Sequence, residues 1–202
     1  MALTDLFGQN AIVRLLFGDS SRTDLAVTMV GVKLGERVLI VGGDDPRLVV
    51  GLAAKSGMSG HVVVIDTDQA RLARAGGAAE RAGVLVEAER APSAMMPFDA
   101  ASFDLAVVGT TTGPARVDDP RNTFLELVRV LRPGGRVVVV QQAPRGGVVG
   151  TVQATVGDGG TSAGDLRTLM TAAGFKGVRV LAERDGLVFF EAGRGVAEND
   201  AH

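Results

Sequence analysis

Three short runs of the sequence are apolar at every position rather than at every second one. They occupy residues 62–65, 105–108 and 137–140, and valine is their commonest residue. Strands of this kind are covered on both faces, as in a parallel sheet that packs between two layers of helices. The runs therefore predict a doubly wound α/β fold.

The order of elements from residue 37 onward supports this fold. The segments RVLIVGG, PRLVVGLAAKSG, HVVVIDTD, QARLARAGGAAERAG and VLVEAER alternate between strand-like and helical patterns. Such alternation predicts right-handed βαβ units. Near the end of the chain, Asp185 and Gly186 separate two apolar runs. This pair predicts a hairpin, and with it an antiparallel pair of strands.

Aspartate followed by proline marks two predicted helix starts. Asp45 precedes Pro46, and Asp119, after Asp118, precedes Pro120. An aspartate side chain caps the first amides, and proline suits the first helical position. The segment LRPGG at 131–135 is expected to end the second of these helices and turn the chain into the next strand. Another helical pattern begins at residue 165 and ends at 173–174.

The chain length fits a single domain. It has 202 residues, of which 46% are hydrophobic and 22% are charged, an ordinary globular balance. We expect an N-terminal helical segment at 1–34 packed on an α/β domain at 35–193. A Gly-rich loop or lid is expected within the domain at 143–164, and a flexible tail at 194–202.

Charge and composition disfavour several classes of function. The net charge is −2 and tryptophan and tyrosine are absent, so nucleic-acid binding is not expected. Cysteine is absent, which excludes disulfides, thiolate nucleophiles and cysteine-ligated zinc, and no metal site is predicted. The first twenty residues contain Asp5 and Arg14 and fit neither a signal peptide nor a membrane span. We therefore expect a cytoplasmic protein without membrane contact.

Four segments carry a resemblance to a known family. GERVLIVGG, PFDAASFDLAVV, LRPGGRVVVV and AAGFKGVRV occur in this order between residues 31 and 193. They resemble the class I S-adenosylmethionine-dependent methyltransferases, in particular the small ubiquinone/menaquinone-biosynthesis-like, type 11 branch. The resemblance implies a seven-stranded sheet of order 3-2-1-4-5-7-6 with the last strand antiparallel. It also implies S-adenosylmethionine as cofactor, lying across the carboxyl ends of the first strands, where open α/β sheets bind ligands.

The turn after the first strand departs from the family pattern of Gly-x-Gly-x-Gly. Gly42 matches the first glycine, but Asp44 and Pro46 stand at the second and third. Glycine at such positions supplies a positive φ or leaves room for the ligand. The resemblance assigns Gly42, Asp44 and the amide of Gly43 to the cofactor turn. The alternative is a plain helix start, capped by Asp45, that binds nothing.

An acidic residue ends the second strand in the family and accepts hydrogen bonds from both ribose hydroxyls. Asp66, followed by Thr67, matches it in type and place, so both are assigned to the cofactor site. The alternative role for Asp66 is to cap the next helix, but Asp68 also stands at that helix start.

The adenine side of the site also departs from the family. Pro92 stands where the family has Asp or Asn and offers no side-chain acceptor. Ser93 is assigned instead, through its backbone amide, with Met95 or Met96 packing on the ring. The alternative places both methionines in the core.

No catalytic residue is assigned. Methyl transfer from a sulfonium is an in-line displacement, so positioning and desolvation of the acceptor supply much of the acceleration. His61 precedes the second strand and His202 is terminal, and neither is expected to be a base. Residues 109–113, which begin with Gly109 and include three threonines, follow the fourth strand where the family places residues near the methyl group. Gln141 and Gln142 end the fifth strand, and strand alternation lets one of them face the crevice.

Two functions stay open. The first is methyl transfer to a small molecule. The second is a methyltransferase-fold protein that has lost cofactor binding and serves as a partner subunit, in a homo- or hetero-dimer, or as a binder of another ligand. The Gly-rich segment 145–164 is poor in aromatic residues, which disfavours a tight pocket for a flat quinone ring. A nicotinamide-dependent oxidoreductase is disfavoured because Gly-x-Gly-x-x-Gly does not follow the first strand.

Overall fold

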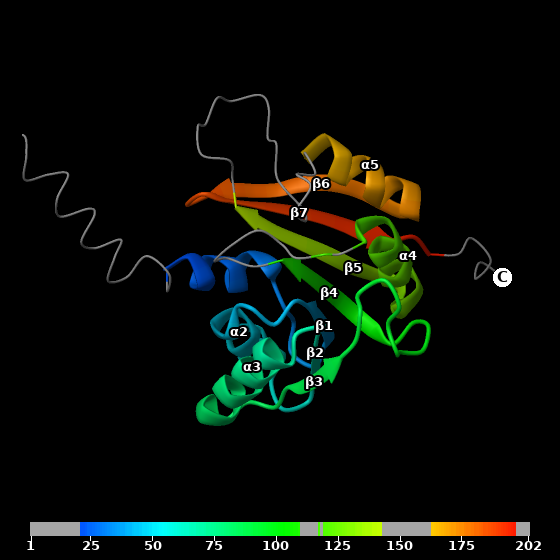
Figure 1. Cartoon of the computed structure of the whole chain (residues 1–202). Helices are drawn as coiled ribbons and strands as arrows, with labels where there is room; N and C mark the ends of the chain where they lie inside the picture. Colours follow the sequence, from blue (N-terminus) through cyan, green and yellow to red (C-terminus); the bar gives the residue numbers. More distant parts are fainter. Residues whose placement is uncertain (1–20, 110–116, 118, 143–162, 197–202) are drawn as a thin grey trace, which may run out of the picture.

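A seven-stranded sheet forms the centre of the protein (Figure 1). The structure, a computed structural model, describes residues 21–109, 117, 119–142 and 163–196. The strand order is β3-β2-β1-β4-β5-β7-β6, and β7 runs antiparallel to both of its neighbours. The predicted order and the antiparallel last strand are confirmed. The strands are β1 (Arg37–Val41), β2 (His61–Asp66), β3 (Glu87–Arg90), β4 (Phe103–Gly109), β5 (Leu131–Gln142), β6 (Phe175–Arg184) and β7 (Leu187–Arg194).

Helices cover both faces of the sheet (Figure 1). One face carries α2, α3 and a helix over residues 21–30, and the other carries α4 and α5. Adjacent residues of each central strand therefore enter different cores. Leu39 of β1 packs with the α4 side, and Ile40 packs with the α2 side. The labelled helices are α2 (Pro46–Ser56), α3 (Gln69–Ala82), α4 (Pro120–Val130) and α5 (Ala163–Ala173).

The continuously apolar runs lie in the middle of this arrangement, as predicted. Val137 and Val139 of β5 contact the core beneath α4 and α5, while Val138 and Val140 contact the core beneath α2. All four are fully buried. A strand with a helix layer on each face needs apolar side chains at every position.

Aspartate caps fix the predicted helix starts. Asp45 accepts a hydrogen bond from the amide of Leu48 at 3.1 Å, and Pro46 is the first residue of α2. Asp119 accepts from the amide of Asn122 at 3.1 Å in front of α4. The other predicted aspartate there, residue 118, lies outside the described residues.

The hairpin between β6 and β7 turns at the predicted pair. Asp185 has a φ of 53° and Gly186 a φ of 73°, the conformation that twists in the same sense as the strands. Arg22, at the start of the helix over residues 21–30, donates from Nε to the carbonyl of Asp185 at 2.9 Å. This contact joins the N-terminal helix to the far edge of the sheet. Residues 1–20 lie outside the described part, so the boundary at residue 34 stays a prediction.

Three boundaries differ from those expected. Ala163 begins α5, so residues 163–164 belong to a helix and not to the Gly-rich loop. The segment 131–135 ends α4 as predicted, with Leu131 as the C-cap, but it also forms the start of β5, because Leu131 already pairs with Phe103. Arg194 is the last residue of β7, and its guanidinium donates to the carbonyl of Leu131. This long-range contact holds Arg194 in the sheet and leaves the predicted tail to begin after it.

Candidate functional site

The carboxyl ends of four parallel strands meet along one edge of the sheet. Val41, at the end of β1, lies in register with Ile65 of β2 and Val108 of β4, and Gly109 lies in register with Val140 of β5. The residues that follow these positions therefore share one edge, which is where open α/β sheets bind ligands. This edge holds most of the residues that the sequence assigned to the cofactor.

The turn after β1 depends on its two glycines. Gly42 has a φ of 104° and donates its amide to the carbonyl of Ile65 at 2.9 Å. A Cβ at Gly42 would lie 3.3 Å from Oδ1 of Asp44, so the Asp44 carboxylate folds back over this glycine. A Cβ at Gly43 would lie 3.4 Å from the backbone of Arg71, so this glycine lets the turn pack closely on α3.

Asp66 is the most completely bonded side chain at this edge. Its residue exposure is 7%. Oδ2 accepts from the amide of Gly43 at 2.9 Å, and Oδ1 accepts from the amide of Asp68 at 2.8 Å. Nη1 of Arg71 lies 3.2 Å from Oδ1 and 3.3 Å from Oδ2. The amide of Gly43, which the sequence assigned to the cofactor, is thus used to hold Asp66 in place.

Several carboxylates share this small volume. Burial raises the pKa of Asp44, the negative charges of Asp66 and Asp45 raise it further, and its own amide and Arg71 act in the opposite direction. Arg71 also lies 3.3 Å from Oδ2 of Asp68, through Nε. Arg71 is therefore the positive charge that several acidic side chains of the edge share.

Asp68, and not Asp66, caps α3. Oδ1 of Asp68 accepts from the amide of Ala70 at 2.8 Å and from that of Arg71 at 3.4 Å. These bonds lower the pKa of Asp68, the one from Ala70 most strongly. The alternative role of Asp66 as the helix cap is therefore not the one that the structure shows. Thr67, between the two aspartates, is exposed, and its carbonyl accepts from Nε of Arg90 at 3.1 Å.

The segment assigned to adenine sits against the start of α4. The hydroxyls of Ser93 and Thr123 lie 2.8 Å apart, and Thr123 is fully buried. Met96 is buried in the core beneath α4, whereas Met95 is 72% exposed. Of the two methionines, Met95 is the one left over to contact a ligand. Pro92 is exposed, and its carbonyl accepts from the amide of Met95 at 3.1 Å.

Two charged residues of α4 clamp the same segment, although no sequence pattern had marked them as site residues. Glu126 accepts from the amide of Met96 at 2.8 Å through Oε2. Arg129 donates to the carbonyl of Phe98 at 2.6 Å and to that of Met96 at 2.9 Å. The hydrogen bond between them lowers the pKa of Glu126 and raises that of Arg129. Glutamate and arginine three residues apart are a signal of an ion pair, but not of these contacts to a distant loop.

The ends of β4 and β5 complete the edge. Gly109 has a φ of 112°, and a Cβ there would lie 2.0 Å from the carbonyl oxygen of Val140, so strand packing alone demands glycine. Gln141 is 1% exposed, and neither polar atom of its side chain has a hydrogen-bond partner among the described residues. Its place in β5 is that of Val137 and Val139, which face α4 and α5. The predicted threonines at 110–112 lie outside the described residues.

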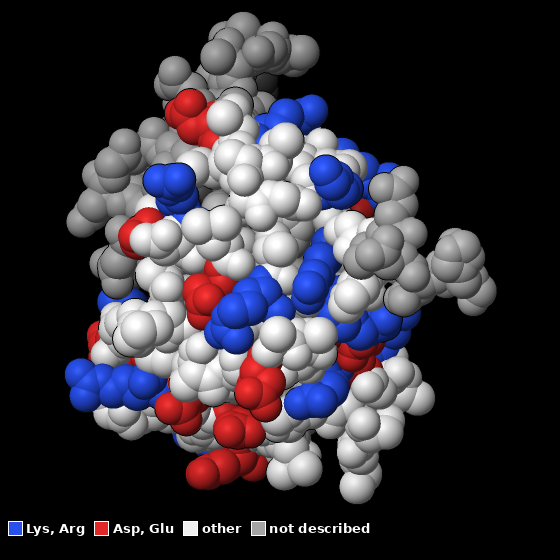
Figure 2. Space-filling model, turned by 90° about the vertical axis from the view of Figure 1, so that its right-hand side faces the viewer, with Lys and Arg blue, Asp and Glu red and all other residues white. Residues whose placement is uncertain are grey.

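The opposite edge of the sheet has a different character. His61 begins β2 and contacts Oε2 of Glu87 at 2.9 Å, as far along β2 from Asp66 as the strand allows. Asp104 accepts from the amide of Arg37 at 2.7 Å and from Nε of Arg132. In Figure 2, which views the side where β5 begins, acidic and basic side chains are interspersed. In the part of the chain that the structure describes, no three His, Asp or Glu side chains gather as metal ligands would.

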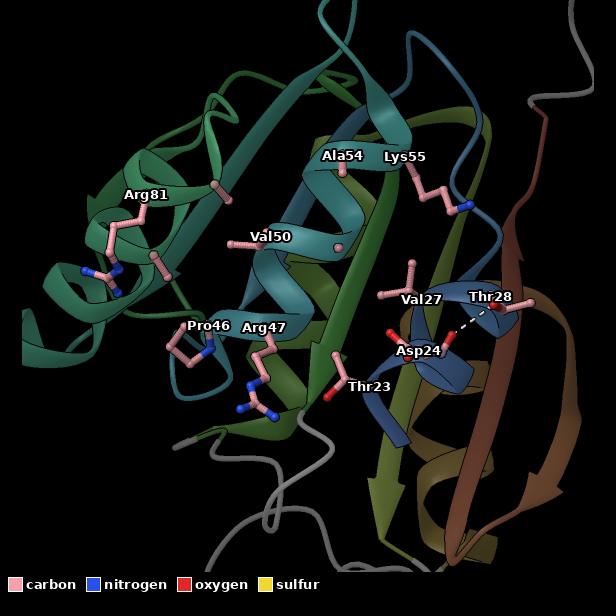
Figure 3. Close-up of a pocket in the computed structure, with 13 residues that line it drawn as sticks. Thr23, Asp24, Val27, Thr28, Pro46, Arg47, Val50, Ala54, Lys55 and Arg81 are labelled. Atoms are coloured by element: carbon pink, nitrogen blue, oxygen red, sulfur yellow. Dashed lines mark hydrogen bonds between the residues drawn. The ribbon is translucent and has the colours of Figure 1, made fainter. Parts of the chain in front are cut away.

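A separate groove of about 910 Å³ lies outside α2, between this helix, α3 and the helix over residues 21–30 (Figure 3). Arg47, Lys55 and Arg81 stand around it at well-separated places. It is distinct from the edge around Asp66: Gly42, Asp44 and Asp66 do not line it, although Pro46, which follows that turn, does. None of the helices in the described ranges is both long and apolar enough to cross a membrane.

Comparisons with known proteins agree with the fold. Residues 47–139 match the family described as a methyltransferase domain. A ubiquinone/menaquinone biosynthesis C-methyltransferase from Idiomarina loihiensis is 30% identical over 113 residues, which are 55% of this chain and 44% of that protein. A demethylmenaquinone methyltransferase from Clavibacter sepedonicus is 34% identical over 107 residues, 53% of this chain and 41% of that protein. The chain thus spans less than half the length of these relatives.

Solved structures share the architecture at low identity. A SAM-dependent methyltransferase from Aquifex aeolicus has a TM-score of 0.70 at 19% identity, covering 85% of this chain and 88% of that one. The cyclase SpnF has a TM-score of 0.67 at 18% identity, covering 87% and 81%. The same sheet thus occurs in proteins named for different reactions, and the site must decide the function.

Proposed function

We propose that this chain, whose sheet has the strand order of the class I S-adenosylmethionine-dependent methyltransferases, binds S-adenosylmethionine at the carboxyl edge of β1, β2 and β4 and transfers the methyl group to a small molecule. The observation that carries this proposal is the position of Asp66. A buried carboxylate ends β2 beside a turn whose first glycine, Gly42, has a positive φ. These are the places where the family holds the ribose and the methionine part of the cofactor.

The chain offers a residue for each part of the cofactor. Asp66 would accept from the ribose hydroxyls, Gly42 would allow the methionine part to approach, and Ser93 with the exposed Met95 would meet the adenine. Asp44 stands over Gly42, where its carboxylate would meet a cationic ammonium or sulfonium group. The other three assigned residues have roles of their own in the structure: the amide of Gly43 bonds to Asp66, the carbonyl of Thr67 accepts from Arg90, and Gly109 makes room for Val140.

The bound cofactor would supply a methyl group already activated on sulfur. The chain would then need to position the acceptor and exclude water. Gln141 suits the first task, because its buried amide has no partner among the described residues and can donate and accept. A buried amide left without a partner is costly, and a polar acceptor would relieve that cost.

The residues at this edge indicate the cofactor in more detail than they indicate the methyl acceptor. The two curated relatives are named for quinone precursors, but they match this chain over less than half of their length. We therefore propose a small polar acceptor without choosing the atom that is methylated. The alternative, a protein of this fold that does not bind the cofactor, gains support from Arg71, which already occupies Asp66.

Isothermal titration of the purified chain with S-adenosylmethionine and with its demethylated product tests the proposal. We expect saturable binding and a rise in melting temperature, because a ligand at about 100 times its dissociation constant adds about 2.7 kcal/mol to the free energy of unfolding. Asp66→Ala should abolish both signals. Glu87→Gln, at the opposite edge, is the matched control and should bind as the wild type does. A folded wild type that shows neither heat nor stabilisation at millimolar ligand, with no gain when the charge of Arg71 is removed, contradicts the proposal and favours the non-binding alternative.

A further inference from the structure

Arg71 of α3 reaches the carboxylate that the cofactor would need. Its Nη1 lies within 3.3 Å of both oxygens of Asp66. The side chain of Arg71 is 21% exposed and that of Asp66 only 4% exposed. The ion pair is therefore largely shielded from water and is stronger than an exposed pair.

The four hydrogen bonds at Asp66 use its full capacity as an acceptor. Two come from the amides of Gly43 and Asp68, which belong to the turn after β1 and to the start of α3. Those amides are fixed by the backbone and cannot leave without opening the turn. Among the described groups that bond to Asp66, the side chain of Arg71 is the one that can move away by a change of rotamer. A diol that binds Asp66 must therefore replace Arg71.

We propose that Arg71 is a displaceable lock on the cofactor site, occupying the ribose acceptor Asp66 until the cofactor takes its place. This inference rests on the proposed function, since it assigns a regulatory role to the same site. Binding then requires the minor population in which Arg71 has left Asp66. The apparent affinity is reduced by the fraction of molecules in that state.

The structure also supplies a place for the displaced guanidinium. Nε of Arg71 is already 3.3 Å from Oδ2 of Asp68, whose side chain is 42% exposed. A rotation away from Asp66 can keep this second ion pair while the first is lost. The lock can therefore open without leaving Arg71 unpaired.

Titration calorimetry with S-adenosylmethionine tests the lock directly and needs no acceptor. Arg71→Met removes the charge and keeps an unbranched side chain. We expect it to bind about tenfold or more tightly than the wild type, because the competing ion pair is gone. Arg81→Met, on the last turn of the same helix, is the matched control and should bind as the wild type does.

Each outcome separates the lock from the proposed function. Tighter binding by Arg71→Met supports both, even where the wild type binds too weakly to measure. Equal or weaker binding by Arg71→Met, with a wild type that binds, overturns the lock and leaves the proposed function intact. Absence of binding by both folded proteins overturns the proposed function and the lock with it. If Arg71→Met is unfolded at the assay temperature, Arg71→Gln gives the same decision, because it keeps a polar side chain but has no positive charge to pair with Asp66.

Discussion

At the scale of single residues, the carboxyl edge of the sheet concentrates negative charge in a partly buried place. Asp44 has Asp45 and Asp66 as neighbours, and Arg71 is the cation that offsets them. Burial first, and these like charges next, raise the pKa of Asp44. The position thus costs folding stability at neutral pH, as is common at sites that serve binding.

Asp44→Asn is expected to raise the melting temperature at pH 7. The folded protein holds the proton of Asp44 more tightly than the unfolded chain does, so the wild type loses stability as pH rises from the ordinary value of 3.8 through the raised pKa. Asparagine has no such loss, and the two proteins should converge as the pH falls toward 3.8. Melting curves between pH 4 and pH 8 measure the difference, with Glu183→Gln on β6 as an exposed control. A stabilisation that does not change with pH would show that charge is not its cause.

At the scale of elements, the helix over residues 21–30 depends on a glycine in α2. A Cβ at Gly51 would lie 2.5 Å from Cγ2 of Val27, a β-branched side chain with little freedom to move aside. Gly76 lies in the interior of α3, and a Cβ there would meet no atom within 4 Å among the described residues. The two glycines occupy similar backbones but different surroundings.

The same substitution should therefore have opposite effects at these two glycines. Gly51→Ala is expected to destabilise the protein by about 1–3 kcal/mol, because overpacking against Val27 outweighs the gain in helix propensity. Gly76→Ala should stabilise it by about 0.5–1 kcal/mol, since alanine restricts the unfolded chain without a clash. Urea unfolding of both variants gives the two values. A stabilised Gly51→Ala would mean that the N-terminal helix does not press on α2.

What the sequence could predict depended on the range of each interaction. The caps at Asp45, Asp68 and Asp119 act within three residues, so local patterns suffice for them. The contacts of Arg129 with Met96 and Phe98 span more than thirty residues, and no local pattern indicates them. A single sequence therefore predicts the helix starts that surround such a site, but not the long-range hydrogen bonds of Arg129.

The residues proposed to bind the cofactor show the same division. Asp66 was identified as a candidate from its place at the end of a strand, but its pairing with Arg71 was not foreseen. A separation of five residues joins the end of β2 to α3 through a turn, so the contact follows from the path of that turn and not from helix spacing. The sequence thus located the edge of the sheet, but it could not predict that Arg71 pairs with Asp66 there.

At the scale of the whole molecule, acidic and basic side chains are arranged differently at the two edges of the sheet. The edge near Asp66 holds several carboxylates around Arg71, whereas at the opposite edge arginines and acids form a linked network in which Arg136 lies near both Glu36 and Glu191. There Arg136 donates to Glu36 at 2.7 Å, and Arg179 donates to Glu191 at 2.7 Å. Ion pairs of this kind favour the folded state modestly and are screened by salt.

Asp104, at the edge opposite the site, is expected to contribute to the loss of stability in acid. Burial raises the pKa of Asp104, but the hydrogen bonds from Arg37 and Arg132 more than offset this, so its pKa lies below the ordinary value of 3.8. The folded state then binds this proton less tightly than the unfolded chain does. The resulting stability is present above pH 3.8 and is lost as pH falls through the lowered pKa.

Asp104→Asn keeps an acceptor for the Arg37 amide but removes the charge. We expect a loss of about 1–2 kcal/mol at pH 7, less in 1 M salt, and convergence with the wild type below the lowered pKa. Urea unfolding at several pH values checks this, and a loss that persists in strong acid would assign the effect to packing and not to charge.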